Sequence, residues 1–343
     1  MLFELYDWGV SAQTLQLLFA LGLGLIFGAA AQISRFCLRR AVIGERAAGA
    51  VWLLALGVAV AGFAAASQAG YLALEGHRYL STDIPVVAIV LGGLAFGAGM
   101  VLTRGCVSRL TVLSAGGNLR AVTVLAVFAI VAHAMLKGVF APLRVALGSV
   151  TLDSPVGSLG QVAGAAPVIA VLLIAAALYL ARVSGARARD MVAGAVIGAV
   201  IVGAWATTSV LLMDEFEPLP VQGAAFTLPW TDTLFWTLAS TAIPAGFGVG
   251  FIGGVLGGAF LAAALRGELA LQSFDSPAQT LRYGAGGAMM GFGGVLAGGC
   301  TVGAGLSGGA ALSVSALLAL GAIIVGGVVM NAVLNPRGAA QPV

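Results

Sequence analysis

Long apolar segments alternate with short polar connections along the whole chain. A helix needs about 20 mostly apolar residues to cross a bilayer, and nine segments meet this requirement. They lie near residues 13–33, 48–70, 85–104, 119–141, 165–183, 190–212, 233–262, 280–297 and 312–333. Hydrophobic residues make up 60% of the chain and charged residues only 8%, whereas soluble domains carry roughly 25% charged residues. The sequence therefore predicts an all-α integral membrane protein, a single membrane domain over residues 1–343 with about nine transmembrane helices.

Basic and acidic residues lie in alternate connections between the predicted helices. Arginines follow the first, third, fifth and seventh helices. The acids that follow the second, fourth and sixth helices are Glu75, Asp83, Asp153, Asp214, Glu215, Glu217 and Asp232. Because positively charged loops stay in the cytoplasm, we expect a bacterial inner-membrane protein with its N-terminus outside and its C-terminus, with Arg337, inside. The net charge of +3 comes from scattered arginines, so membrane lipid is an expected partner and nucleic acid is not.

One segment of the chain occurs twice. The stretch GGLAFGAGMVLTRGC, which ends at Cys106, matches GGAMMGFGGVLAGGC, which ends at Cys300, at eight of fifteen positions. The match predicts two pseudo-repeats, at about 13–141 and 190–333, joined by a linking helix at about 165–183. Five predicted helices separate the two cysteines, so the repeats are inverted and their Gly-Cys segments should approach each other from opposite faces. Transporters built in this way bind substrate near the midplane.

Each of the three cysteines follows an apolar helix that gives way to a polar or glycine-rich stretch, after which a helical pattern resumes. Irregular backbone at membrane depth persists only where it is buried in protein or lines a cavity. A short re-entrant helix that begins there directs its N–H groups and positive dipole end at the cavity, which suits an anion. A thiol is a weak donor and a soft acceptor, so it suits a ligand with a sulfur end and still permits release.

The alternative is that a cysteine in a membrane helix is only a small apolar packing residue. Cys106 and Cys300 recur after a glycine at equivalent repeat positions, which favours a function for both. Cys37 lacks this support, because a weaker match of Gly24 and Gly28 with the glycines at 194 and 198 sets it opposite Thr207.

Three segments resemble the YeeE/YedE family of sulfur-compound transporters. They are RFC (Arg35–Cys37), GAGMVLTRGC (Gly97–Cys106) and GFGGVLAGGCTVG (Gly291–Gly303). The resemblance implies uptake of thiosulfate or a related sulfur or selenium compound, an hourglass-like shape with short helices from both faces, and three cysteines along the path. It also implies a cytoplasmic sulfur-carrier partner of the TusA type. Arg104 departs from the family pattern, because a small residue is expected there.

These observations define a set of candidate pathway residues. Glycines let the backbone turn beside each repeated cysteine, and arginine, glutamine and threonine side chains supply hydrogen-bond donors. The candidates are Cys37, Cys106, Cys300, Gly105, Gly299, Arg104, Arg109, Gln32 and Thr301. Cysteine and histidine residues show no metal-ligand spacing, so no cofactor and no metal are predicted.

Transport without catalysis is the preferred interpretation, and two others stay open. One is a membrane sulfurtransferase or redox protein that forms a cysteine persulfide, and the other is a channel for another small solute. The predicted spans carry no deep Asp or Glu, which argues against a carboxylate proton relay and favours passive or downstream-driven uptake. His133 and Lys137 share one face of the fourth helix with an undecided role, and Asn118 is expected to cap that helix.

Overall fold

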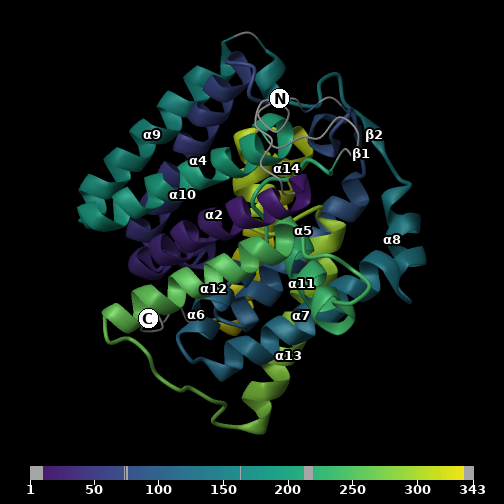
Figure 1. The fold of residues 1–343 in the computed structure, drawn as a ribbon. Helices are drawn as coiled ribbons and strands as arrows, with labels where there is room; N and C mark the ends of the chain where they lie inside the picture. Colours follow the sequence, from purple (N-terminus) through teal and green to yellow (C-terminus); the bar gives the residue numbers. More distant parts are fainter. Residues whose placement is uncertain (1–10, 73, 75, 163, 212–218, 336–343) are drawn as a thin grey trace.

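Helices account for nearly all regular structure in the computed structural model, which describes residues 11–72, 74, 76–162, 164–211 and 219–335 (Figure 1). The α-helices are α2 (Ala12–Ser34), α3 (Leu38–Val42), α4 (Arg46–Gln68), α5 (Val86–Leu102), α6 (Val107–Ala115), α7 (Leu119–Lys137), α8 (Ala141–Gly148), α9 (Ala165–Ser184), α10 (Ala188–Ala206), α11 (Thr227–Ala239), α12 (Phe247–Leu265), α13 (Pro277–Leu296) and α14 (Val314–Leu334). Shorter elements are the 3₁₀-helices η1 (Arg78–Leu80) and η2 (Leu159–Gln161), the π-helices η3 (Thr207–Leu211) and η4 (Gly303–Gly308), and the antiparallel strands β1 (Asp83–Ile84) and β2 (Leu152–Asp153).

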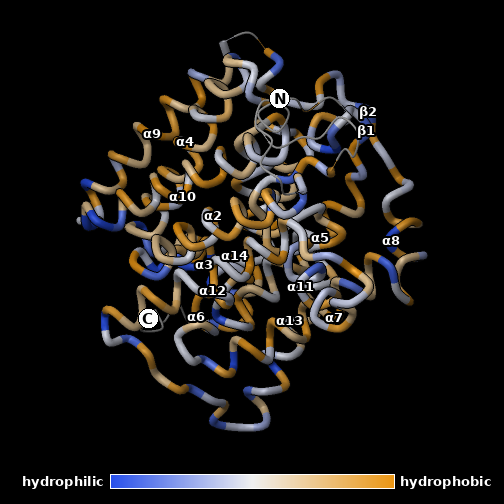
Figure 2. The backbone as a smooth tube through the Cα atoms, viewed as in Figure 1, coloured by the Kyte–Doolittle hydropathy of each residue, from blue (hydrophilic) through white to orange (hydrophobic). Residues whose placement is uncertain are grey.

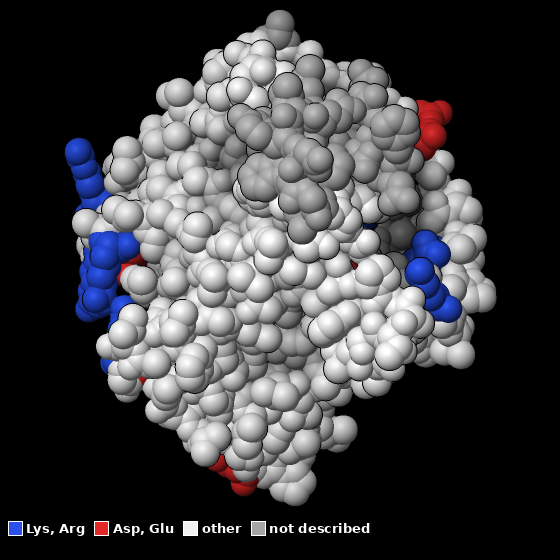
Figure 3. Space-filling model, viewed as in Figure 1, with Lys and Arg blue, Asp and Glu red and all other residues white. Residues whose placement is uncertain are grey.

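Eight helical segments in the described part of the chain are long and apolar enough to cross a membrane. Hydrophobic residues run along the helices, and hydrophilic ones gather at their ends and connections (Figure 2). Among the described residues seen in Figure 3, most charged side chains lie toward the edges of the face, and its centre is largely uncharged. The prediction of an all-α integral membrane protein is confirmed.

The count of nine transmembrane helices stays a prediction. Helix α13 covers the predicted span 280–297, but it carries Arg282 and is not among the eight apolar segments. The predicted outward acids Glu75, Asp214, Glu215 and Glu217, and the C-terminal Arg337, lie outside the described residues.

The predicted continuous span 233–262 is wrong. Two helices occupy this region, because α11 ends at Ala239 and α12 begins only at Phe247. Pro244 lies between them, where its ring removes a backbone donor and disfavours helical backbone at the residue before it. Gly246, the N-cap of α12, is extended. Only α12 is among the candidate spans.

Glycine seams join several of the apolar helices directly. Helix α2 packs against α12, and α5 packs against both α13 and α14. A Cβ atom on Gly28 would overlap the carbonyl oxygen of Val255, and one on Gly258 would overlap that of Leu25. The backbones therefore touch directly, as small residues allow at membrane helix interfaces.

A single methyl group in this seam is expected to destabilise the fold. Gly258→Ala would drive Cβ into the backbone of α2, and overpacking of this kind costs about 1–3 kcal/mol. Gly253→Ala, in the same helix, is the matched control, because its Cβ would meet no heavy atom within 4 Å. Thermal unfolding in detergent should show a lower melting temperature for Gly258→Ala only; equal melting temperatures would contradict the seam.

The helix packing can be compared with the two predicted halves. Helix α2 packs on α12 and α4 on α10, while α5 packs on α14 and α7 on α13. The corresponding helices of the two predicted halves are α2 and α10, α4 and α12, α5 and α13, and α7 and α14. When each helix is replaced by its counterpart, the α2–α12 contact becomes α10–α4, and the α5–α14 contact becomes α13–α7. Related halves would give this pattern, and the inverted repeats themselves stay a prediction. Helix α9 covers the predicted linking segment and packs on α4.

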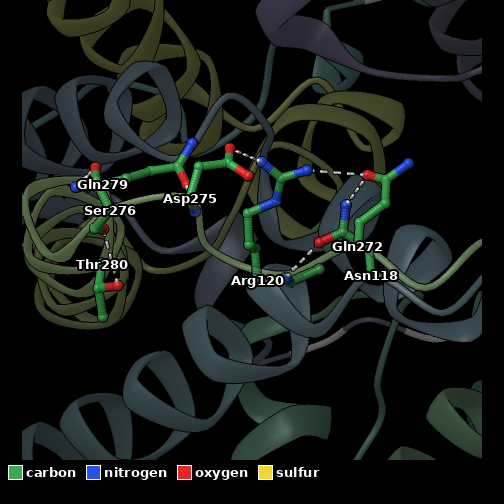
Figure 4. Close-up of polar contacts among 8 residues, drawn as sticks. Asn118, Arg120, Gln272, Asp275, Ser276, Gln279 and Thr280 are labelled. Carbon is green, nitrogen blue, oxygen red and sulfur yellow. Dashed lines mark hydrogen bonds and ion pairs between the residues drawn. The ribbon is translucent and has the colours of Figure 1, made fainter.

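The connection from α12 to α13 is tied to the start of α7 (Figure 4). The side chain of Asn118 accepts from the backbone N–H of Ala121 at 3.1 Å, which confirms the predicted cap. Its amide also donates to Gln272 at 2.8 Å, and Arg120 lies 3.5 Å from Asp275. These contacts fasten the segment that leads into α13.

Candidate functional site

The three cysteines follow helix ends of one kind. The residue two positions before each cysteine has left-handed backbone, with φ of 52° at Arg35, 57° at Arg104 and 72° at Gly298. A left-handed residue commonly ends a helix. Cys37 and Cys106 are then extended and serve as the N-caps of α3 and α6. The predicted helix breaks at the cysteines are confirmed by this backbone geometry.

The first two cysteines form a buried thiol pair. The Sγ atoms of Cys37 and Cys106 lie 3.9 Å apart, and both side chains are at most 4% exposed. The Cys106 thiol lies 3.2 Å from the hydroxyl of Ser108 and within reach of the hydroxyl of Thr301. Thr301 directly follows Cys300, so the two Gly-Cys segments come close together at this residue. Their approach from opposite faces of the membrane stays a prediction.

A guanidinium group stands beside the thiol pair. Arg109, in the first turn of α6, interacts electrostatically with both Cys37 and Cys106. Its Nη1 atom is buried and has no hydrogen-bond partner among the residues that the structure describes. A buried donor without a partner is costly, so Arg109 is a candidate for binding a ligand.

Cys300 directly precedes Thr301 in the chain. Its Sγ accepts from the backbone N–H of Gly303 at 3.4 Å, and the Tyr79 hydroxyl donates to the Gly303 carbonyl at 3.0 Å. Arg78 donates to the Gly298 carbonyl at 2.7 Å. Arg78, Gly298 and Gly303 border a cavity of about 40 Å³. It is called the outer pocket here because the predicted orientation of the chain would place it on the outer side of the membrane. Its lining residues are Arg78, Leu136, Ala225, Thr227, Leu228, Gly294, Val295, Gly298, Gly299 and Gly303.

Thr227 and Arg78 give the lining of the outer pocket a polar character. The Thr227 hydroxyl is buried without a hydrogen-bond partner in the described part of the chain. Burial and, second, the Arg78 charge lower the pKa of His77 to about 4, so this ring is neutral at cellular pH. Arg78 is the charged side chain among the residues that line this pocket.

The glycines beside the repeated cysteines differ in surroundings. A Cβ on Gly299 would lie 2.7 Å from the backbone nitrogen of Ala304, whereas one on Gly105 would lie 3.4 Å from Leu110 Cδ2. Gly299 is therefore the position where the close approach of backbone needs glycine.

Two predicted pathway residues lie apart from the thiol pair. Gln32 donates to Glu268 at 2.8 Å, so its amide binds the connection that follows α12. Arg104 is exposed and lines a second cavity with Arg39 and Arg282. The structure thus brings together Cys37, Cys106, Arg109 and Thr301, with Cys300 and Gly299 next along the chain.

His133 and Lys137 join α7 to α11. The His133 ring stacks on Phe235 with centroids 4.9 Å apart, and Asp232 interacts electrostatically with both His133 and Lys137. These contacts fasten α11 to α7 and leave a further role undecided.

Sequence reasoning missed Arg78, Tyr79 and Thr227. A signal for Arg78 exists, because it is an arginine in a connection predicted to face outward, against the general distribution of arginines in the chain. Nothing in the sequence pattern singles out Thr227, which reaches the outer pocket through the fold alone.

Fold and site define a multi-pass α-helical membrane protein with three buried cysteines at helix breaks, none of them in a disulfide. The chain belongs to the sulphur transport family, whose model matches residues 27–329, and the resemblance to the YeeE/YedE family is thereby confirmed. Two relatives carry the name thiosulfate transporter TsuA. The one from Spirochaeta thermophila is 28% identical over 270 residues, covering 74% of this chain and 77% of the relative. The one from Escherichia coli is 25% identical over 308 residues, covering 81% and 83%.

Proposed function

We propose that this protein carries thiosulfate, or a closely related small sulfur anion, across the bacterial inner membrane into the cytoplasm. The observation that carries the proposal is the Cys37–Cys106 thiol pair, 3.9 Å apart, beside the unpartnered Nη1 of Arg109. Two relatives named thiosulfate transporter, each aligned over most of this chain, support the choice of substrate.

The two ends of thiosulfate need different partners, and this site holds both kinds. Its oxygens suit charge-assisted hydrogen bonds from Arg109 and bonds from the hydroxyls of Ser108 and Thr301. Its terminal sulfur is soft, and thiol S–H groups are weak donors of matching softness. Weak contacts hold the ion without trapping it, as transport requires.

The contacts suggest an order along the path. An ion that enters through the outer pocket meets Arg78 and Gly299 first, then the Cys300 thiol. Thr301 links this position to Cys106, which shares the ion with Cys37. Helices α5 and α13 are antiparallel, because Gly92 faces Ala297 and Gly99 faces Gly286. The breaks after these helices therefore lie at opposite ends of the pair, which supports an hourglass-like path entered from both faces.

Uptake of radiolabelled thiosulfate into proteoliposomes tests the proposal. We expect saturable uptake that excess unlabelled thiosulfate suppresses and excess sulfate suppresses far less, because sulfate lacks the soft sulfur end. Equal competition by sulfate and neutral solutes would favour a channel for another small solute. Absence of uptake with folded protein would reject transport. Co-purification with a TusA-like sulfur carrier tests the proposed cytoplasmic partner.

One observation favours the persulfide alternative. Cys37 and Cys106 are close enough for one thiolate to attack a sulfur bound to the other. The persulfide would form first, when a cysteine thiolate attacks the outer sulfur of thiosulfate, the S–S bond breaks, and sulfite leaves with the electron pair. Mass spectrometry after exposure to thiosulfate decides between the two. A cysteine heavier by one sulfur, with free sulfite, supports the enzyme; unmodified thiols with measurable uptake support the transporter.

A further inference from the structure

A second cavity is lined by three arginines, two of which lie two residues from a cysteine of the thiol pair in the sequence. It has a volume of about 80 Å³ and is bordered by Arg39 of α3, Arg104 after α5 and Arg282 of α13. Its remaining lining residues are Val101, Asn331, Leu334 and Asn335. No acidic side chain is among them. The inner pocket, as we call it, therefore concentrates positive charge in a small volume.

Within the part of the chain that the structure describes, no acidic side chain forms an ion pair with any of the three guanidinium groups. The ion pairs of the described residues involve Arg40, Arg120, Arg189 and Arg266, and none of these lines the inner pocket. The Nε atoms of Arg39 and Arg282 are buried without a hydrogen-bond partner in the described chain. Arg39 also lies within electrostatic range of both Arg104 and Arg282. Like charges held together in this way repel, and a bound anion would offset the repulsion.

Two of the arginines that line the inner pocket are close to the cysteines of the thiol pair in the sequence. Arg39 follows Cys37 by two residues, and Arg104 precedes Cys106 by two. Arg104 has left-handed backbone at the position where the second repeat has Gly298. An L-residue is strained in that conformation and glycine is not, so a cation stands where the backbone would accept glycine more readily.

We propose that the inner pocket is a release subsite that binds the oxygen end of a small dianion as it leaves the thiol pair. This inference rests on the proposed transport function. Guanidinium groups recognise oxyanion oxygens by charge-assisted hydrogen bonds and make no use of a soft sulfur. The inner pocket should therefore bind sulfate about as well as thiosulfate, while selection for thiosulfate resides at the thiols. A lipid phosphate shares the oxyanion chemistry, and the test separates the two sources.

The test measures anion-dependent thermal stabilisation of the purified protein, a readout independent of transport. The variants are Arg282→Gln and the control Arg182→Gln, an exposed arginine at the end of α9 that makes the same change in charge. Sulfate and thiosulfate should each raise the melting temperature of the unsubstituted protein and of Arg182→Gln. For Arg282→Gln the half-saturating sulfate concentration should rise about tenfold or more, since loss of a charged hydrogen bond costs about 1.5–3 kcal/mol and 1.4 kcal/mol is tenfold.

A structural role for Arg282 makes a different prediction. Removing one of three repelling charges should leave the melting temperature without anion unchanged or raise it, whereas loss of a structural contact would lower it at every sulfate concentration. Unaltered sulfate response in Arg282→Gln overturns the proposal. So does stabilisation in nanodiscs that needs phosphatidylglycerol in place of phosphatidylcholine and ignores sulfate, since the occupant is then a lipid. If sulfate binds as expected but thiosulfate uptake is absent, transport fails and the anion site stands.

Discussion

Replacing Cys106 with alanine is expected to reduce thiosulfate uptake about tenfold or more. Cys106 contacts the Cys37 thiol at 3.9 Å and the Ser108 hydroxyl at 3.2 Å, and Thr301 lies within its reach. Its loss removes a donor to the ion at the centre of the proposed path. A hydrogen bond to a charged group contributes about 1.5–3 kcal/mol, and each 1.4 kcal/mol is a factor of about ten. Uptake into proteoliposomes at equal protein content measures the effect.

Two companion variants separate the lost thiol from a disturbed fold. Cys106→Ser keeps a donor of similar size and should retain more uptake than the alanine variant. Ser114→Ala lies in the same helix, where its hydroxyl donates to the Thr111 carbonyl, and should transport normally. A folded Cys106→Ala protein that transports at the unsubstituted rate would remove the thiols from the mechanism.

Oxidation should link Cys37 to Cys106 and block uptake. The two Sγ atoms are 3.9 Å apart, and a small shift would bring them to the roughly 2.05 Å of a disulfide. An added oxidant such as copper phenanthroline accepts the two electrons, both thiol protons leave, and one S–S bond forms. Both S–H donors are then lost and the path narrows. Peptide mass spectrometry without reductant identifies the bond, and uptake measured before and after reduction gives its effect.

The matched control for oxidation is Cys37→Ala, in which Cys106 has lost its neighbour. Treatment should leave the residual uptake of this variant unchanged, and reductant should restore uptake only in the protein that retains both thiols. Full uptake in protein shown to carry the Cys37–Cys106 bond would count against a path between these side chains.

Local features of this molecule follow from local sequence. The sequence predicts the helix breaks before Cys37, Cys106 and Cys300 because apolar residues are followed there by arginine or glycine. The left-handed backbone at Arg35 and Arg104 ends the helices at these positions. The cap at Asn118 follows from the same kind of short-range chemistry. Long apolar segments likewise predicted the membrane helices, apart from the interruption around Pro244.

Contacts between distant segments did not follow from the sequence. The repeat paired Cys106 with Cys300, yet the direct thiol contact of Cys106 is with Cys37, 69 residues away. Gln32 was expected at the anion and instead donates to Glu268, 236 residues away. Periodicity and spacing describe one element at a time, so they cannot show which helix ends meet.

The glycine seams bear on how the protein moves. Where Gly24 and Gly28 meet the backbone of α12, and Gly97 meets that of α14, sliding one helix along the other would bring a bulkier residue against a carbonyl. Such seams disfavour the large rocking of halves that carries substrate in many transporters. The expected motion is instead local, in side chains such as Arg78, Arg109 and Arg39. In such a protein the ion would pass while the packed helices keep their arrangement.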